Sequence, residues 1–147
     1  MADEPTELVR RFYEELWNRG EVGIADALFA SDYVRHDLRP GTAAPGPQGQ
    51  KDVALLFRKA FPDVHMTIDV LIAAPPFVVV RWTMRGTNTG QWAGSPASGR
   101  VVSFCGVNIF RFENGKVVEL WNHRDDLGLM EQVGSRIYAG QPTERKG

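Results

Sequence analysis

The chain of 147 residues has the length of one domain and can bury a single hydrophobic core. With 43% hydrophobic and 24% charged residues, its composition is that of a folded globular protein and excludes a disordered chain. Seventeen basic and eighteen acidic side chains give a net charge of −1 with no run of either sign, so we expect no nucleic-acid partner. We treat 1–147 as one domain with an ordered core over roughly 5–137.

The start of the chain, MADEPTELVRR, carries acids before any apolar stretch, unlike a signal peptide. No window approaches the 18 apolar residues of a membrane span, and the single Cys105 cannot form an internal disulfide. We therefore expect a cytoplasmic protein without a membrane partner.

Helical patterns occupy the first part of the chain. From Thr6, apolar residues recur at spacings of one, three and four, and Gly20 is a reasonable stop. A short helix is predicted from about Val22 to Phe29, followed by a turn at Ser31 and Asp32.

Residues 33–52, YVRHDLRPGTAAPGPQGQKD, are rich in proline and glycine and predict a long loop. A third helix is expected over 52–61, closed by Pro62.

After Pro62 the apolar period changes to two, which indicates strands. The Asn114–Gly115 pair predicts a tight hairpin, and Pro75 and Pro76 mark another turn. Residues 127–140 suit a last short helix or turn. The four predicted strands are 65–73, 77–88, 100–112 and 116–125.

Helices followed by strands indicate an α+β fold. We expect a cone-shaped α+β barrel, in which N-terminal helices close a strongly curved antiparallel sheet around one apolar cavity. Because the strands carry Val and Phe on both faces, a homodimer is expected to cover the outer face.

Alternate residues of the last strand share a face, so Glu119, Trp121, His123 and Asp125 are expected to point the same way. An apolar cavity disfavours the charged form of a carboxylic acid and makes it a usable proton acceptor. Asp125 is the candidate general base; the alternative is an Asp that caps the following turn. His123 could support an oxyanion or orient the acid, or be an exposed strand residue.

Further candidates contact a substrate. Tyr33 and His36 stand at the start of the long loop, and Trp82 and Trp121 offer flat area for fused rings, although a tryptophan is also an ordinary core residue. Asn88 and Asn108 are amides in apolar strands that could bind a substrate carbonyl or satisfy backbone groups at a bulge. Three widely spaced histidines and no paired cysteines predict no metal, and we expect no other cofactor.

The string FRFENGKVVELWNHRDDLGLMEQVG carries a Gly-Lys pair, a Glu-x-Trp motif, an Asp four residues on, Leu-Gly-Leu and Gln-x-Gly. It resembles the end of the SnoaL-like polyketide cyclases, in the nuclear transport factor 2-like superfamily. RWTMRGTNTGQWAGSPASGRVV is similar to that family's third-strand region, so the resemblance covers nearly the whole chain. It implies a cone with a cavity, frequently a dimer, and a catalytic acid at the position of Asp125.

The chain also departs from the family pattern. Many relatives have His at the position of Asn88, and some have His at that of Asn108; an amide cannot deliver a proton near neutral pH. The resemblance implies a cofactor-independent tailoring enzyme of antibiotic biosynthesis, an aldol cyclase that acts on a hydrophobic aromatic polyketide with Asp125, His123 and Asn108 as catalytic groups. The alternatives are a cofactor-independent hydroxylase of an anthracycline-type polyketide and a non-catalytic binding module.

Overall fold

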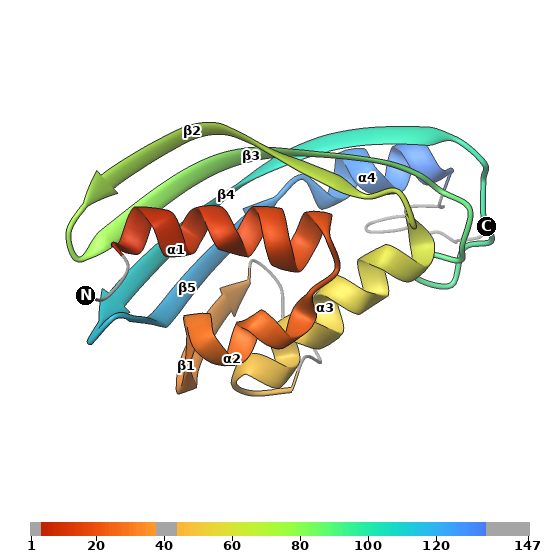
Figure 1. Cartoon of the computed structure of the whole chain (residues 1–147). Helices are drawn as coiled ribbons and strands as arrows, with labels where there is room; N and C mark the ends of the chain where they lie inside the picture. The colour runs from red at the N-terminus through yellow and green to blue at the C-terminus, as the bar shows by residue number, and fades with distance from the viewer. Residues whose placement is uncertain (1–3, 38–43, 135–147) are drawn as a thin grey trace, which may run out of the picture.

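The computed structural model of the protein describes residues 4–37 and 44–134. One curved five-stranded sheet has helices over its concave face, and its strand order is β1-β5-β4-β3-β2 (Figure 1). Strands β1 and β2 are free edges, so the sheet stays open rather than closing into a barrel. The α+β class and the curved sheet agree with the sequence prediction. The strands are Phe29–Asp37 (β1), His65–Ala74 (β2), Phe77–Thr87 (β3), Val101–Glu113 (β4) and Lys116–Arg124 (β5).

The four strands predicted from the period-two pattern are confirmed to within one residue at each end. Asn114 and Gly115 adopt positive φ angles of 51° and 77° and form the tight turn between β4 and β5, which pair antiparallel. Clear alternation and one turn signal were therefore enough to predict this part of the sheet.

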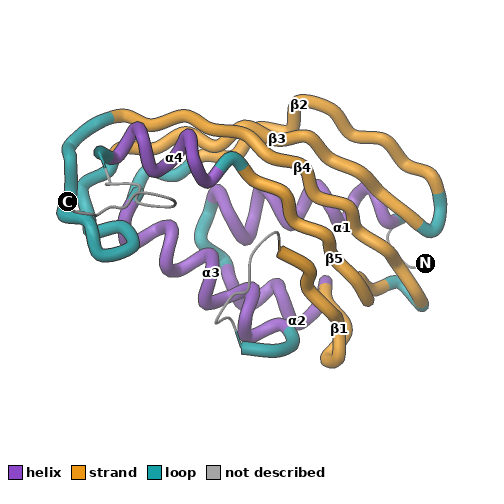
Figure 2. Tube along the Cα trace, turned by 180° about the vertical axis from the view of Figure 1, so that it is seen from behind, coloured by secondary structure: helices purple, strands orange, loops and turns teal. Residues whose placement is uncertain are grey.

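Strand β1 was missed, because it lies in the segment that was predicted as a turn and a loop. It pairs parallel with β5, so the sheet is mixed rather than wholly antiparallel, and Figure 2 shows β1 as an edge strand alongside β5. Polar residues fill most of this strand and hide its alternation. The helix after it begins at Pro47 rather than residue 52, because proline is suited to the first turn of a helix.

The first helix and the short second helix agree with the prediction. Pro5–Arg11 (α1) runs directly into wider, π-helical turns over Phe12–Asn18 (η1). The others are Val22–Ile24 (η2), Ala25–Leu28 (α2), Pro47–Ala60 (α3) and Asp126–Val133 (α4). The predicted last helix is confirmed as α4, and its expected continuation from residue 135 lies outside the described residues. Among the described residues, none of the helices is both long and apolar enough to span a bilayer.

Helix η1 supplies much of the core. Its Phe12, Tyr13, Leu16 and Trp17 are buried, and the Phe12 ring meets Phe110 of β4 edge-on at 5.4 Å between centroids. The Asn18 side chain then holds the edge strand β2: its Nδ2 donates to the Met66 carbonyl at 3.0 Å, and its Oδ1 accepts from the Met66 amide at 2.6 Å. The wide helix is thereby fixed across the sheet.

Gly106 allows a close approach on the inner face of the sheet. Trp82, Gly106 and Arg124 are paired across β3, β4 and β5 and form one row. A Cβ atom at position 106 would collide with the Trp82 ring and lie 2.5 Å from the His123 carbonyl oxygen. Only glycine lets the indole approach β4 this closely.

We predict that Gly106→Ala destabilises the protein by about 1–3 kcal/mol, because the extra methyl group must displace the Trp82 ring or the backbone of β5. Urea unfolding measures the change. The matched control is Gly23→Ala in η2, where an added Cβ meets nothing within 4 Å. Equal unfolding midpoints for the two variants would contradict the close packing.

Candidate functional site

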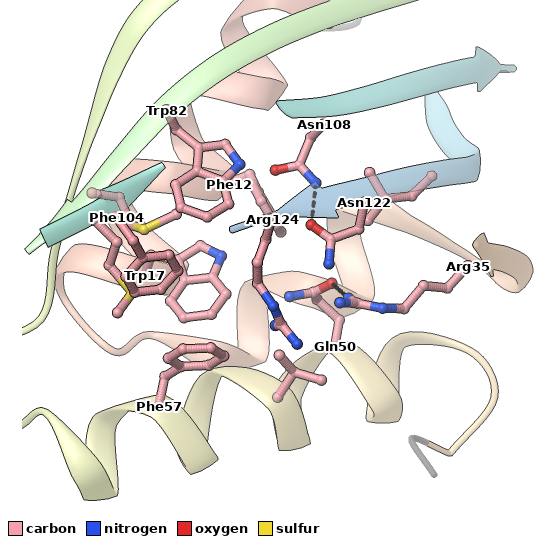
Figure 3. Close-up of a pocket in the computed structure, with 14 residues that line it drawn as sticks. Phe12, Trp17, Arg35, Gln50, Phe57, Trp82, Phe104, Asn108, Asn122 and Arg124 are labelled. Atoms are coloured by element: carbon pink, nitrogen blue, oxygen red, sulfur yellow. Dashed lines mark hydrogen bonds between the residues drawn. The ribbon is translucent and has the colours of Figure 1, made fainter. Parts of the chain in front are cut away.

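A cavity lies between η1 and α3 on one side and the concave face of the sheet on the other (Figure 3). One part of its wall is apolar and largely aromatic, with Phe12, Trp17, Phe57, Trp82, Met84 and Phe104 among its members. The remaining wall is polar and is made by Arg35, Gln50, Asn108, Asn122 and Arg124. An apolar cavity with a few converging polar groups is the usual form of a small-molecule site.

The cavity is narrow. Its free space is about 360 Å³, including the part that opens to solvent, and side chains divide most of it. The Arg124 side chain crosses the middle of the cavity, with its guanidinium carbon 5.2 Å from the centre of the Phe57 ring (Figure 3). A ligand with fused rings therefore enters only if Arg124 moves aside.

A chain of hydrogen bonds runs along the polar wall. The Tyr13 hydroxyl donates to Asn108 Oδ1 at 2.8 Å, Asn108 Nδ2 donates to Asn122 Oδ1 at 2.9 Å, and Asn122 Nδ2 donates to Asp37 Oδ1 at 2.9 Å. Sheet register explains the contacts, because Asn108, Asn122 and Asp37 are paired in one row across β4, β5 and β1. Side chains that share a row lie on the same face.

Asp37 is the ionised end of this chain. Arg35 Nε donates to Asp37 Oδ2 at 2.8 Å, and Arg35 Nη1 donates to Gln50 Oε1 at 2.9 Å. Burial is the largest single influence on the Asp37 pKa and acts to raise it, but the hydrogen bonds from Arg35 and Asn122 outweigh burial and hold the pKa below its ordinary value of 3.8. The carboxylate is therefore charged at neutral pH.

Tyr13 is the protonated end. Burial raises the pKa of its hydroxyl well above the ordinary value of 10.0, so the group remains a hydrogen-bond donor. Because the Asp37 carboxylate can only accept hydrogen bonds, the Nδ2 group of Asn122 must face it. The Oδ1 atom of Asn122 then faces Asn108 and accepts from its Nδ2 group. The two amides are thus held in one orientation.

Two indole N–H groups in the cavity wall have no such partner. Trp17 and Trp82 are 6% and 3% exposed, and neither Nε1 atom makes a hydrogen bond with any part of the chain that the structure describes. Figure 3 shows both nitrogen atoms on the edges of the rings that face the polar side of the cavity. Buried donors are nearly always paired, so these two are exceptional.

Of the residues predicted from the sequence, Asn108 and Trp82 lie in the cavity wall. Tyr33 is buried against the Phe29 ring and, with Arg35 and Asp37, lines a separate hollow at the end of β1. Their contacts with a substrate remain predictions.

Glu119, Trp121 and His123 share a face as predicted, but it is the outer face of the sheet. The Trp121 ring stacks on His36 with centroids 5.0 Å apart, and His36 Nε2 lies 2.7 Å from Glu119 Oε2. The hydrogen bond from His36 lowers the pKa of the Glu119 carboxyl most, and the hydrogen bond from Arg111 lowers it further. His36 and Trp121 therefore do not reach the cavity, and His123 is exposed. The inner face of β5 instead carries Leu120, Asn122 and Arg124.

Asp125 does not face the cavity either, in contrast to the prediction. Its carboxylate caps helix α4 by accepting a hydrogen bond from the Gly128 amide at 2.8 Å, which is the structural alternative considered for this residue. Asn88 was expected to contact a substrate or to satisfy backbone groups. Its amide donates to the Gly90 carbonyl at 2.7 Å and accepts from the Ser98 amide at 2.9 Å, so it supports the loop after β3 and lies outside the cavity.

Sequence reasoning missed most of the polar wall. Arg35 lies in the segment predicted as loop, as does Asp37, which bonds to Arg35 from behind the wall, and Gln50 lies in a helix start that was placed too late. Asn122 carries the same signal as Asn108, an amide within an apolar strand, but the predicted inward orientation of its neighbour Trp121 assigns Asn122 to the outer face.

The protein therefore belongs to the α+β class, with an open, curved sheet whose concave face and covering helices enclose a part-aromatic, part-polar cavity. Residues 7–133 match the SnoaL-like polyketide cyclase family, and the chain belongs to this family. No curated protein sequence matches the chain.

Three solved structures of similar fold are proteins of Streptomyces species. TsrD from Streptomyces laurentii is 27% identical with a TM-score of 0.79, covering 89% of this chain and 95% of its own. IdmH from Streptomyces antibioticus, provisionally assigned as a polyketide cyclase, is 28% identical with a TM-score of 0.76, covering 90% and 99%. AclR from Streptomyces galilaeus, provisionally assigned as a hydroxylase, is 25% identical with a TM-score of 0.78, covering 88% and 95%.

The Asp37 pKa predicts an acid-sensitive contribution to stability. Because the folded-state pKa lies below 3.8, the Asp37 contacts stabilise the protein fully above the unfolded-state pKa and are lost as the pH falls through the folded-state pKa. Asp37→Asn should therefore cost about 1 kcal/mol at pH 6 and progressively less below pH 3.8. Urea unfolding across pH measures the difference. Asp32→Asn, at an exposed position of the same strand, is the control, and a pH-independent cost of Asp37→Asn would contradict the ionised network.

Proposed function

We propose that the protein is a cofactor-independent tailoring enzyme that removes an acidic proton beside a carbonyl group of a hydrophobic polyketide-type substrate and so promotes aldol-type ring closure. The observation that supports this most is the divided cavity: aromatic rings on one side, and on the other an amide chain that ends at an ionised carboxylate. Aromatic walls position fused rings, and fixed donors stabilise an enolate oxygen.

The proposed reaction needs one base and several donors. The base takes the proton from the carbon atom, and the electron pair of the broken C–H bond becomes an enolate. The enolate carbon attacks a second carbonyl of the same molecule, a C–C bond forms, and the new alkoxide takes a proton back. Donors among the Gln50, Asn122 and Arg124 side chains, which line the cavity, would hold the enolate oxygen.

Geometry favours Asp37 as the base over Asp125. Asp37 bonds to two residues of the cavity wall, Arg35 and Asn122, and its side chain is 26% exposed. Its low pKa makes it a weak base, so the substrate must itself be acidic, as a carbon between two carbonyls is. The assignment of Asp125 as the base rests on the family resemblance alone.

A hydroxylase is the second candidate, and its support is the similarity to AclR. The same deprotonation would give an electron-rich anion that reacts with dioxygen instead of a second carbonyl. A non-catalytic binding module would use the cavity without turnover.

Product analysis of aromatic polyketide precursors that carry a 1,3-dicarbonyl group tests these proposals. With wild type we expect an isomeric or dehydrated product that forms equally with and without air. Asp37→Asn should lower the rate about 100-fold or more, because the base is lost, whereas Asp125→Asn should weaken the α4 cap and leave turnover close to wild type.

The reverse ranking of the two variants would assign the base to Asp125. A product that gains oxygen only in air would favour the hydroxylase, and unchanged precursor bound by all three proteins would favour the binding module.

We also propose that a second copy of the chain covers the outer face of the sheet. Ile72, Val79, Ile109 and Trp121 are paired in register from β2 to β5 and form an apolar row on that face, where Ile72 is 55% exposed. Covering such a row removes apolar area from water.

Light scattering after size exclusion should give about twice the 16.4 kDa chain mass for wild type and the mass of one chain for Ile72→Glu. Leu56→Glu is the matched control, since Leu56 is 54% exposed on α3, away from the row, and the variant should remain dimeric. A monomeric wild type would refute the proposal.

A further inference from the structure

Trp17 and Trp82 are the only described residues with a buried side-chain nitrogen or oxygen atom that lacks a hydrogen-bond partner. Both belong to the cavity wall, and they come from opposite sides of it: Trp17 from η1 and Trp82 from the middle of β3. Two unpaired indole N–H donors that face one cavity indicate a shared role in binding there, rather than two unrelated packing defects.

Local packing keeps both N–H groups in place. The Trp82 ring packs closely against Gly106 and meets the Phe104 ring edge-on at 5.8 Å, so it has little freedom to turn. Trp17 meets the Phe57 ring at 5.5 Å, and Arg58 Nη1 donates to its backbone carbonyl at 2.7 Å. Rings that are fixed in this way cannot turn their N–H groups toward solvent.

An indole nitrogen donates one hydrogen bond and accepts none. The partner of each indole N–H group must therefore supply a lone pair. A carbonyl oxygen on a ring system supplies one, and the ring itself suits an aromatic pocket. The amide chain does not supply this partner: the Asn108 and Asn122 carbonyl oxygens accept from Tyr13 and Asn108, and neither indole N–H group bonds to them.

We infer that Trp17 and Trp82 are specificity-determining residues that select ring ketones over hydrocarbons of the same shape, by donating their indole N–H groups to carbonyl oxygen. This inference deepens the proposed function, since it assigns the acceptor chemistry of the substrate. It concerns binding alone and is independent of the identity of the base. The donors act when Arg124 has moved from the middle of the cavity, so that a ring can lie between the two indoles.

The test compares 1-indanone with indane, which share one bicyclic shape and differ by the carbonyl group. Titration of ¹⁵N-labelled protein followed by NMR resolves the indole N–H signals of the four tryptophans, with Trp92 and Trp121 as internal references. We expect 1-indanone to bind more tightly than indane and to move the Trp17 and Trp82 signals downfield, as hydrogen bonding does.

Variants separate the donor from the ring. Trp17→Phe and Trp82→Phe keep an aromatic ring and remove the N–H group, and each should lower the preference for 1-indanone over indane about fivefold to tenfold. Trp92→Phe, at a buried tryptophan outside the cavity wall, should leave the preference unchanged. Because the preference is a ratio within one variant, a general loss of stability does not alter it.

Indanone binding no tighter than indane binding, including no binding of either, would overturn the inference, as would an unchanged preference in both variants. Loss of turnover plays no part in the test. A retained preference for the ketone together with no catalysis would refute the proposed function and leave the inference standing.

Discussion

The Asp37 carboxylate, held charged at the end of β1, is the constraint on which the site depends. It can only accept hydrogen bonds, so it determines the direction of every bond from Tyr13 through Asn108 and Asn122. This row of hydrogen bonds joins η1, β4, β5 and β1, and therefore connects the wide helix η1 to both the middle and the edge of the sheet. A partly buried polar network of this kind contributes to a unique structure only when its buried members are satisfied, and Tyr13, Asn108 and Asn122 each have a partner here.

How much of this could be predicted from the sequence depends on the alternation of each strand. Strands β2 to β5 carry enough apolar residues at period two to define their bounds, and the Asn114–Gly115 turn defines one pairing. The face of β5 could not be assigned, because Leu120 and Trp121 are both apolar and register shifts at Arg111–Phe112 in β4 and within β1 change which residues meet. Strand β1 was hidden for a related reason: the residues that build the site, Arg35 and Asp37, break its apolar pattern.

The two amides at positions where the family resemblance leads us to expect histidine have different consequences. Asn88 binds the backbone of the loop after β3, so a histidine there would act on loop structure and not in the cavity. Asn108 lies in the cavity wall between Tyr13 and Asn122. Among the described residues that line the cavity, none is a carboxylic acid or a histidine, and the proposed proton transfer therefore uses Asp37, behind the wall, together with the substrate's own acidity. This arrangement suits a carbon acid that needs only a weak base.

The acidic motif after β5 is connected to the cavity without facing it. Asp125 caps α4 through the Gly128 amide, and a Cβ atom on residue 128 would collide with that carboxylate, so the glycine and the acid require each other. Asp126, in the first turn of the same helix, accepts a hydrogen bond from Arg124 Nε at 2.7 Å. Arg124 in turn crosses the cavity above Phe57 and limits its size. The motif thus holds the end of β5 and the start of α4 in the geometry that places a guanidinium in the path of a ligand. Its influence on the site is exerted through Arg124.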